Sequence, residues 1–505
     1  MTQTTTNILR GVYGLTGEET EELLLIQKRR MAIRARDNFY TFCVFMDSEF
    51  FTSGKPHLKE IANALQMVES GLITKLTLSL PPRAGKSYIV SLYCAWYLGR
   101  HPEKSIMRNA YGDSLAMKFS YDVRTIVQLP DYLEVFPDIK LKSDKSQVSD
   151  WALTTAKQSS YFCAGVGGAV TGKGCDGVSI LDDPIKNIDE AMSELVLEKK
   201  WQWYTSTHKS RMEKNCPEIQ IATRWSKKDV IGKIGDMDKC ISLDQFLLDP
   251  SLYANFWVQV VVPALDDKGQ SFCEEVKSTY EYHELKRITD SFIWEAEFMQ
   301  NPVESKGSLF PESELQYFKL NELRKYAEGT PKAGEIICNA TVGTTDTADE
   351  GLDFLGSIIG RMIQGKVYVT DVVFTQDPIE VTEPRVAQQI INTGCNKMQI
   401  ESNAGGKSFA KNIQKLCKGK TPCTITWKAT SQNKETRILM KSGMIKQFFV
   451  FRSKDDYAAG SDYDLFMRQL LSYVKFGTNK HDDAADVATM LAEVTLEKKT
   501  LTTIQ

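Results

Sequence analysis

The chain has 505 residues, a length that favours two or three domains, each with room for its own hydrophobic core. Its apolar fraction of 42% and charged fraction of 25% are those of a globular protein, and a net charge of -3 excludes binding to nucleic acid through overall positive charge. Contact with DNA would therefore need local basic patches.

The sequence shows neither a structural zinc motif nor a targeting or membrane-spanning segment. The 11 cysteines form no C-x-x-C pair, which argues against a structural zinc site and indicates reduced thiols. The polar start of the chain has no signal-peptide core, and no segment reaches the roughly 18 apolar residues of a membrane span. We expect a soluble intracellular protein.

The first predicted elements are two helices, over residues 18–37 and 57–69, where apolar residues recur at helical spacing. Between them lies an aromatic run that contains Phe39, Tyr40, Phe42, Phe45, Phe50 and Phe51. We favour core packing for these rings, because aromatic runs usually supply buried area. The alternative is the wall of a pocket beside an adenine ring.

The next stretch has the order of a phosphate-binding loop: a strand over residues 76–80, the sequence Pro-Pro-Arg-Ala-Gly-Lys-Ser over 81–87, and a helix. In such loops backbone N–H groups at the helix N-terminus face the phosphates, Lys86 would reach the β and γ phosphates, and Ser87 would offer its hydroxyl to Mg²⁺. Leu80 replaces the first glycine of the motif. An ordinary strand-to-helix turn is therefore the alternative.

Strands then alternate with helices, as in a strand over residues 105–110 and a helix over 114–128, which predicts a mostly parallel, doubly wound α/β sheet. A buried strand over 177–181 ends in Asp182 and Asp183, at the sheet edge where such folds bind ligands. Asp182 would hold Mg²⁺, usually through water, and Asp183 or a nearby acid would position the attacking water. Ordinary turn chemistry is the alternative.

Two further segments of the first half carry candidate functions. The glycine-rich residues 165–174 favour a mobile loop near the nucleotide over a flexible linker. A strand over 219–222 ends in Thr223 and Arg224, where a polar group would sense the γ-phosphate.

Together these motifs resemble the large terminase subunit of tailed bacteriophages, the motor that packages DNA into procapsids. The resemblance rests on residues 81–87, 171–174, 181–187, 190–193, 203–204 and 223–225, which occur in the order of that family. It implies a P-loop ATPase of the additional-strand type with a small lid subdomain.

The resemblance also implies roles for individual residues. The ATP-binding set is Pro82, Arg83, Ala84, Gly85, Lys86, Ser87, Asp182 and Thr223, with Ser87 and Asp182 at the metal. Asp183 stands where many relatives carry a catalytic glutamate, which leaves the water-activating carboxylate open, with Glu190 and Glu194 as further candidates. Arg83 would stabilise transition-state charge in cis, and Arg124 is either an arginine supplied to a neighbouring subunit or a solvated surface residue.

The predicted domains are an ATPase over residues 1–300, including a lid over about 226–300, a linker over 301–334, and a second α/β domain over 335–505. In the second domain Asp346 follows a first strand, two more strands form a meander, Glu401 ends a fourth strand, and Asp482, Asp483 and Asp486 open a late helix. This order resembles the RNase H-like nucleases that terminases carry at their C-terminus.

Two divalent ions about 4 Å apart need several carboxylates to clamp them. Asp346, Glu401 and Asp483 are the favoured catalytic ligands, with Asp482 close behind and Asp486 auxiliary. Helix N-terminal charge and turn chemistry are the alternatives. Basic residues surround this region and would neutralise phosphates, or form a solvated face: Lys407, Lys411, Lys415, Lys418, Lys420, Lys428, Lys434 and Arg437.

The resulting prediction is a motor that uses ATP and Mg²⁺ to move double-stranded DNA into procapsids, and a nuclease, with Mg²⁺ or Mn²⁺, that cuts concatemers. The resemblance implies a homo-oligomeric ring, usually of five subunits, on the portal protein, with a small terminase subunit as partner. It implies action in the host cytoplasm and absence from the mature virion. A helicase-like ATPase fused to a repair or recombination nuclease is the alternative, and a nucleotide-switched scaffold is another.

Overall fold

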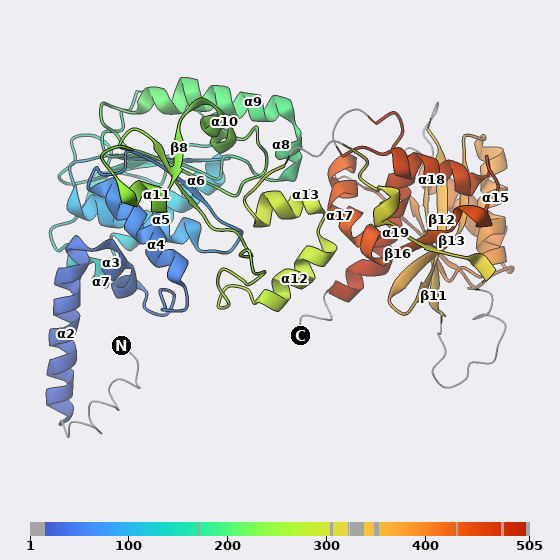
Figure 1. Cartoon of the computed structure of the whole chain (residues 1–505), viewed down its shortest axis with the longest axis horizontal. Helices are drawn as coiled ribbons and strands as arrows, with labels where there is room; N and C mark the ends of the chain where they lie inside the picture. Colours follow the sequence, from blue (N-terminus) through green and yellow to red (C-terminus); the bar gives the residue numbers. More distant parts are fainter. Residues whose placement is uncertain are drawn as a thin grey trace. The chain divides into compact units, whose positions relative to one another are not determined.

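The computed structural model describes residues 16–168, 172–303, 307–321, 323, 338–347, 353–403, 405–430, 433–475 and 479–500. The chain divides into two compact units (Figure 1). The first comprises Met1–Tyr282 with Glu295–Val303, and the second comprises His283–Trp294 with Glu304–Gln505. Within the described ranges, no helix is long and apolar enough to cross a membrane.

The first unit is built on a nine-stranded sheet of order β3-β4-β5-β2-β6-β7-β1-β9-β8. Its strands are β1 Lys75–Ser79, β2 Ile106–Ala110, β3 Leu141–Gln147, β4 Asp150–Leu153, β5 Tyr161–Phe162, β6 Val178–Asp182, β7 Glu218–Ala222, β8 Cys240–Ser242 and β9 Trp257–Val261. Neighbours from β5 to β8 pair in parallel, and β3 and β4 are antiparallel additions at one edge. The predicted mostly parallel, doubly wound sheet is confirmed.

The order of the central strands identifies the type of P-loop sheet. Strand β7 lies between β1, which leads into the glycine loop, and β6, which ends in Asp182. A strand inserted at this place is the defining feature of the additional-strand P-loop fold that the sequence predicted. The carboxyl ends of β1, β6 and β7 therefore meet at one edge, where open α/β sheets bind ligands.

Helices pack on both faces of this sheet, as the alternation of strands and helices requires. The helices of this unit are α2 Gly17–Asp37, α3 Phe39–Met46, α4 Pro56–Glu69, α5 Lys86–Arg100, α6 Asp113–Ile126, α7 Pro130–Val135, α8 Ile188–Met192, α9 Glu194–Trp203, α10 Val230–Met237 and α11 Leu243–Leu248, and α12 Thr279–Ile288 begins in it. Phe39 and Phe42 are fully buried in the main core of the unit, so the core interpretation of the aromatic run is confirmed for these rings.

The region predicted as a lid, about residues 226–300, contains strands β8 and β9. Strand β9 pairs with β1 and β8 pairs with β9, so residues within 226–300 complete the central sheet. The short strand β9 was not predicted because its region has a mixed polar and aromatic composition, although Trp257 and Val258 are buried. The predicted linker likewise contains β10, Gln316–Phe318, which pairs with a strand of the second sheet.

The second unit has a seven-stranded sheet of order β10-β16-β13-β12-β11-β14-β15. Its other strands are β11 Cys338–Asp346, β12 Leu355–Ile363, β13 Lys366–Thr375, β14 Lys397–Glu401, β15 Thr424–Lys428 and β16 Phe449–Arg452. Strands β11, β12 and β13 form the predicted antiparallel meander, and β14 runs parallel to β11. The first residues of the predicted first strand, 335–337, lie outside the described residues.

Helices cover both faces of the second sheet (Figure 1). They are α15 Ile379–Thr393, α16 Gly406–Cys417, α17 Lys434–Phe448, α18 Asp462–Ser472 and α19 Asp483–Thr500, and the unit also contains the short α13 Ser291–Ile293. On β12, Leu355 and Ile359 join the core under α15 and α16, whereas Gly356 and Gly360 face Val487 and Leu491 of α19. Alternate residues of one strand thus serve the two faces.

Candidate functional sites

The loop between β1 and α5 has the backbone of a tight anion-binding turn. Gly85, directly before α5, has a φ of +86°, and a Cβ there would lie 2.9 Å from Cζ of Phe50. Both the left-handed conformation and the close ring require glycine. Arg83 also has a positive φ, of 67°, and its side chain is exposed. The predicted ligands Pro82 to Ser87 therefore form one compact turn at the helix N-terminus, a position at which backbone N–H groups can bind phosphate.

Lys86 is held at the carboxyl edge of the sheet by two residues that the sequence singled out. Its Nζ lies 2.9 Å from Oδ1 of Asp183 and donates a hydrogen bond of 2.5 Å to Oγ1 of Thr223. The N–H of Thr223 donates to the same Asp183 oxygen, at 3.0 Å. The structure thus brings the loop lysine, the second acid and the β7 threonine into one cluster.

Asp182 lies beside this cluster and is fully buried. Its Oδ2 accepts hydrogen bonds from Arg108, whereas its Oδ1 has no hydrogen-bond partner in the described part of the chain. Burial raises the pKa of the carboxyl group, against the opposing effect of the Arg108 guanidinium. A buried carboxylate oxygen without a partner is rare, and together with the Ser87 hydroxyl it suits Mg²⁺ held through water. The predicted metal residues of the ATP site therefore fit the ion.

The other predicted residues of the first unit have partners away from Lys86. Arg124 donates to the carbonyl of Ser146 at 2.7 Å, which ties its side chain to the same subunit. Glu190 pairs with Lys200 at 2.8 Å, and the exposed Glu194 pairs with Lys228. Neither glutamate is hydrogen-bonded to Lys86. In the glycine-rich segment, residues 169–171 lie outside the described residues.

Glu297 is a site residue that the sequence did not reveal. It belongs to the π-turn η3, Trp294–Phe298, and its carbonyl accepts a 2.5 Å hydrogen bond from Gln300, whose Oε1 accepts from the N–H of Arg224 at 3.0 Å. Burial raises the pKa of Glu297 to about 7, and Lys86 acts in the opposite direction. The carboxyl group therefore lies within the electrostatic reach of the loop lysine. No spacing in the sequence pointed to it, because its position depends on the return of the chain past β9.

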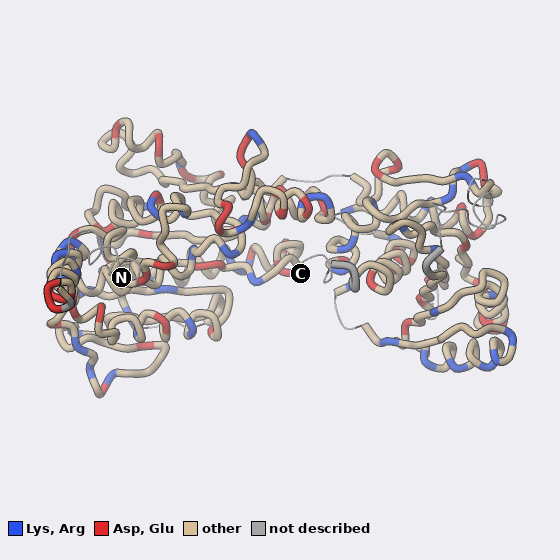
Figure 2. The backbone as a smooth tube through the Cα atoms, turned by 90° about the horizontal axis from the view of Figure 1, so that it is seen from below, with Lys and Arg blue, Asp and Glu red and all other residues tan. Residues whose placement is uncertain are grey.

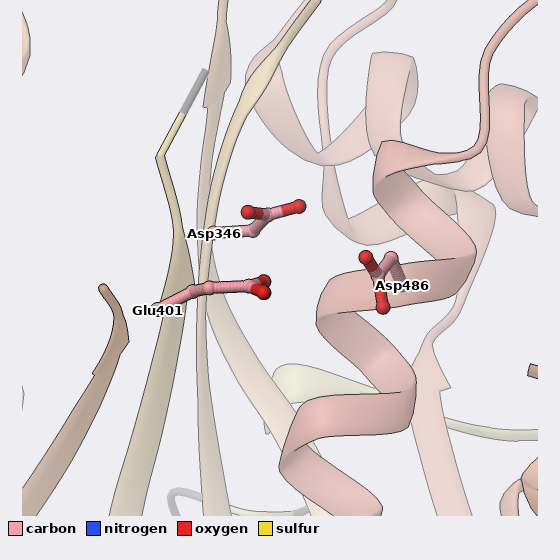
Figure 3. A group of neighbouring side chains, drawn as sticks. All are labelled: Asp346, Glu401 and Asp486. Atoms are coloured by element: carbon pink, nitrogen blue, oxygen red, sulfur yellow. The ribbon is translucent and has the colours of Figure 1, made fainter. Parts of the chain in front are cut away.

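The second unit gathers three carboxylates at the edge of its sheet. Ligand oxygens of Asp346, Glu401 and Asp486 all lie within 4.8 Å of one another, and Figure 3 shows the first two extending from neighbouring strands toward the third on α19. Strands β11 and β14 are parallel neighbours, so their terminal acids lie side by side. Carboxylates at this spacing, two of them buried, can clamp a divalent ion.

A glycine lets the helix come close enough to complete this cluster. Asp346 is paired across the sheet with Gly356, and a Cβ on Gly356 would lie 3.1 Å from Cγ1 of Val487. Because Val487 directly follows Asp486, the contact at Gly356 sets the distance of Asp486 from the strand acids. A larger residue at Gly356 would crowd the Val487 side chain.

Two basic residues neutralise the cluster. Lys434 Nζ lies 2.8 Å from Asp482, 3.1 Å from Asp486 and 3.9 Å from Asp346, and Arg437 also donates to Asp486. Burial lowers the pKa of Lys434, but Asp486 and Asp346 outweigh it and raise the pKa overall. Burial raises the pKa of Asp346 well above its usual value, as does Asp486. The sequence placed Lys434 and Arg437 among residues that would face DNA; the structure instead places them against the acids.

The helix acids differ in their surroundings. Asp483, favoured from the sequence as the third ligand, is buried and accepts a 3.4 Å hydrogen bond from Gln469. Asp482 is occupied by Lys434, and Asp486, predicted as auxiliary, is the helix acid that joins Asp346 and Glu401. The relative contribution of these three acids stays a prediction.

Comparison with known proteins agrees with this geometry. Residues 345–445 match the family described as Terminase Bacteriophage T7, Ribonuclease H-like domain. This part of the chain is therefore similar to the Ribonuclease H-like domain of terminases. The predicted RNase H-like fold is confirmed, as is the predicted resemblance to large terminases. A search of curated proteins found no match.

Several solved structures are similar to the chain at low identity. The large terminase of a thermophilic bacteriophage is 10% identical with a TM-score of 0.47, covering 88% of this chain and 99% of that one. The bacteriophage HK97 large terminase is 12% identical with a TM-score of 0.35, covering 87% and 94%. The human cytomegalovirus terminase nuclease domain is 11% identical with a TM-score of 0.29, covering 38% and 97%.

Proposed function

We propose that this protein is a viral DNA-packaging motor that couples ATP hydrolysis to movement of double-stranded DNA and cuts that DNA with a metal-dependent endonuclease. The observation that carries the proposal is the presence, in one chain, of an additional-strand P-loop sheet and a terminase-type Ribonuclease H-like domain whose acids converge. Either unit alone would be compatible with many functions.

In the first unit, the turn ending at Gly85 would bind the phosphates through backbone N–H groups, and Lys86 would move from Asp183 to the β and γ phosphates. Magnesium, held by Ser87 and Asp182, would neutralise phosphate charge. Asp183 contacts Lys86, Glu297 lies within its electrostatic influence, and either would orient the attacking water. Exposed Arg83 has the freedom to reach the transferring phosphate. Thr223 links Lys86 to β7 and so would report the state of the γ-phosphate.

In the second unit, Asp346, Glu401 and Asp486 would hold the divalent ions, Mg²⁺ or Mn²⁺, with Asp482 and Asp483 in support. The ions would activate water and stabilise the leaving oxygen of the DNA strand. Lys434 contacts three of these acids, so a bound cation must compete with its ammonium. Lys434 would therefore lower the affinity of this site for a divalent ion.

Helix α16 provides a basic face next to the acids. Lys407, Lys411 and Lys415 are exposed at intervals of four residues, and α16 has no acidic residue. A run of basic positions along a helix of the second unit can be followed in Figure 2. The helix starts against Glu401, because a Cβ on its first residue, Gly406, would lie 1.9 Å from the Glu401 carbonyl oxygen. Lysines about 6 Å apart on a helix can contact successive phosphates of one DNA strand.

The assembly follows from the resemblance to large terminases. The motor would act as a homo-oligomeric ring, with five subunits the usual number in that family, docked on the portal protein in the host cytoplasm. A small terminase subunit would select the DNA, and Arg124 would serve a neighbouring subunit only if its bond to Ser146 opens.

The test is an ATPase and plasmid-cleavage assay on the full chain, Lys86→Ala and Asp346→Ala. We expect Lys86→Ala to lose ATP turnover and keep cutting, and Asp346→Ala to do the reverse, in Mg²⁺ or Mn²⁺. Normal cutting by Asp346→Ala would remove the nuclease from the proposal. Packaging assays with procapsids then separate a motor from a repair ATPase, because only a packaging motor is stimulated by a portal.

A further inference from the structure

Arg108 on β2 joins the two elements that would carry the metal ligands of the ATP site. Its Nε and Nη2 donate to Oδ2 of Asp182 at 3.1 and 2.5 Å, and its Nη1 donates to Oγ of Ser91 at 2.8 Å. Nη2 also donates to the carbonyl of Ser87 at 3.2 Å. One side chain thus ties the end of β6 to the first turn of α5.

The guanidinium is locked in this position. Arg108 and Asp182 are both 0% exposed, and the ring of Phe119 lies 3.9 Å from the guanidinium carbon. A buried charge persists only when it is paired and hydrogen-bonded, and here every nitrogen of the fork has an acceptor. Four of its five N–H donors are used in these hydrogen bonds, and the whole side chain is buried.

Arg108 contacts only one of the two carboxylate oxygens of Asp182. Both hydrogen bonds from Arg108 go to Oδ2, and the buried Oδ1 has no hydrogen-bond partner among the described residues. A pair that served packing alone would gain from satisfying both oxygens, because an unpaired buried acceptor is costly. The arrangement instead leaves one buried carboxylate oxygen without a hydrogen bond, on the residue that Arg108 links to Ser87.

We propose that Arg108 is a positioning residue for the magnesium site: it fixes Ser87 and Asp182 relative to each other and turns the Asp182 carboxylate so that Oδ1 serves the hydration shell of the ion. The inference rests on the proposed ATPase function. It requires the forked guanidinium, since a lysine ammonium would keep the charge without reaching β6 and α5 through separate nitrogens. Arg108 itself would contact neither the nucleotide nor the ion.

The experiment measures how much Mg²⁺ tightens the binding of a fluorescent ADP analogue to the full chain, as the ratio of Kd without and with the ion. For Arg108→Lys we expect that ratio to fall about tenfold, with Kd in EDTA changed by less than about threefold. The matched control is Glu218→Gln, which breaks the ion pair between the buried Glu218 and the exposed Lys209 at the opposite end of β7. It should lower Tm and leave the ratio unchanged.

A folded Arg108→Lys protein with the wild-type ratio would overturn the proposal. If Arg108→Lys does not fold, Ser91→Ala decides, because it removes the acceptor of Nη1 and leaves Asp182 in place. A lowered ratio for Ser91→Ala supports the positioning role and an unchanged ratio rejects it. A different result would refute the proposed function. If the wild-type chain binds no nucleotide, either with Mg²⁺ or in EDTA, the ATP site itself is refuted.

Discussion

The ammonium of Lys86 and the carboxylate of Asp183 form an ion pair of 2.9 Å, in which the side chains are only 11% and 25% exposed. Nucleotide phosphates must compete with Asp183 for this lysine. We expect Asp183→Asn to tighten ADP binding by roughly fivefold, the equivalent of about 1 kcal/mol for a partly buried pair. Fluorescence titration measures that change. Weaker ADP binding by Asp183→Asn would show that the pair does not compete with phosphate.

Asp183→Asn also shows whether Asp183 only holds Lys86 in place or also orients the attacking water. If Asp183 is the group that positions the attacking water, Asp183→Asn will lose roughly 100-fold or more in ATP turnover while it binds ADP more tightly. If turnover changes only a few-fold, the water-orienting role passes to another carboxylate, for which the half-buried Glu297 is a candidate because Lys86 influences its pKa.

Glu297 predicts a pH dependence for that second case. Its pKa of about 7 leaves the carboxyl group neutral at lower pH and ionised at higher pH, and only the ionised form can accept a proton or hydrogen bond from water. ATP turnover should therefore rise from about pH 6 to about pH 8. Glu297→Gln should be slow and flat over this range, whereas Glu295→Gln, in the same turn, should keep the wild-type profile. An unchanged profile in Glu297→Gln would exclude this role.

The sequence predicted those site residues that lie at the ends of regular elements. Lys86 follows a strand and opens a helix, and Asp182, Asp346 and Glu401 end buried strands, so local pattern alone places them at sheet edges. The order of strands and helices then predicted which strands are neighbours, because parallel strands joined through helices have few allowed arrangements.

The remaining site residues depend on contacts that no local pattern contains. The rotation of α19 over Gly356 decides which of three nearby aspartates meets the strand acids. Lys434 has the exposed charge pattern of a DNA-binding residue, yet it turns toward acids far away in the sequence. Glu297 comes near the proposed ATP site because the chain returns past β9. That region had been predicted as a lid from its composition.

The choice between the helix acids is directly testable. We expect Asp486→Asn to lose DNA cleavage by roughly 100-fold or more and to lose the rise in Tm that Mn²⁺ gives the wild type, because it removes one of three converging ligands. Asp483→Asn should retain more of both. The reverse order of effects would restore Asp483, the residue favoured from the sequence, as the third ligand.

Lys434 should oppose metal binding at the nuclease site. In Lys434→Met the acids lose one of their two internal cations and keep Arg437, so we expect a lower Tm in EDTA but a larger Tm increase on adding Mn²⁺ than in the wild type. Lys454→Met, on the exposed turn η5 Lys454–Asp456, removes an equal charge away from the acids. Thermal melts of the three proteins, each with and without Mn²⁺, measure the effect. Equal Mn²⁺ shifts in wild type and Lys434→Met would show that the lysine does not compete with the ion.

The basic face of α16 should appear in the salt dependence of DNA binding. Each phosphate contact contributes a slope of about 0.9 to the fall of log K with log salt concentration on duplex DNA, so Lys407→Ala with Lys411→Ala should reduce the slope by about 1.8. Anisotropy titrations with a short labelled duplex in EDTA, between about 50 and 200 mM salt, measure it without cleavage. Lys319→Ala with Lys454→Ala removes the same charge from exposed positions outside α16 and should leave the slope near that of the wild type. Equal losses in the two double variants would mean that the DNA responds to overall charge, whereas a loss confined to α16 would place the duplex along the helix that starts at Glu401 and so direct the phosphate backbone toward the carboxylate cluster.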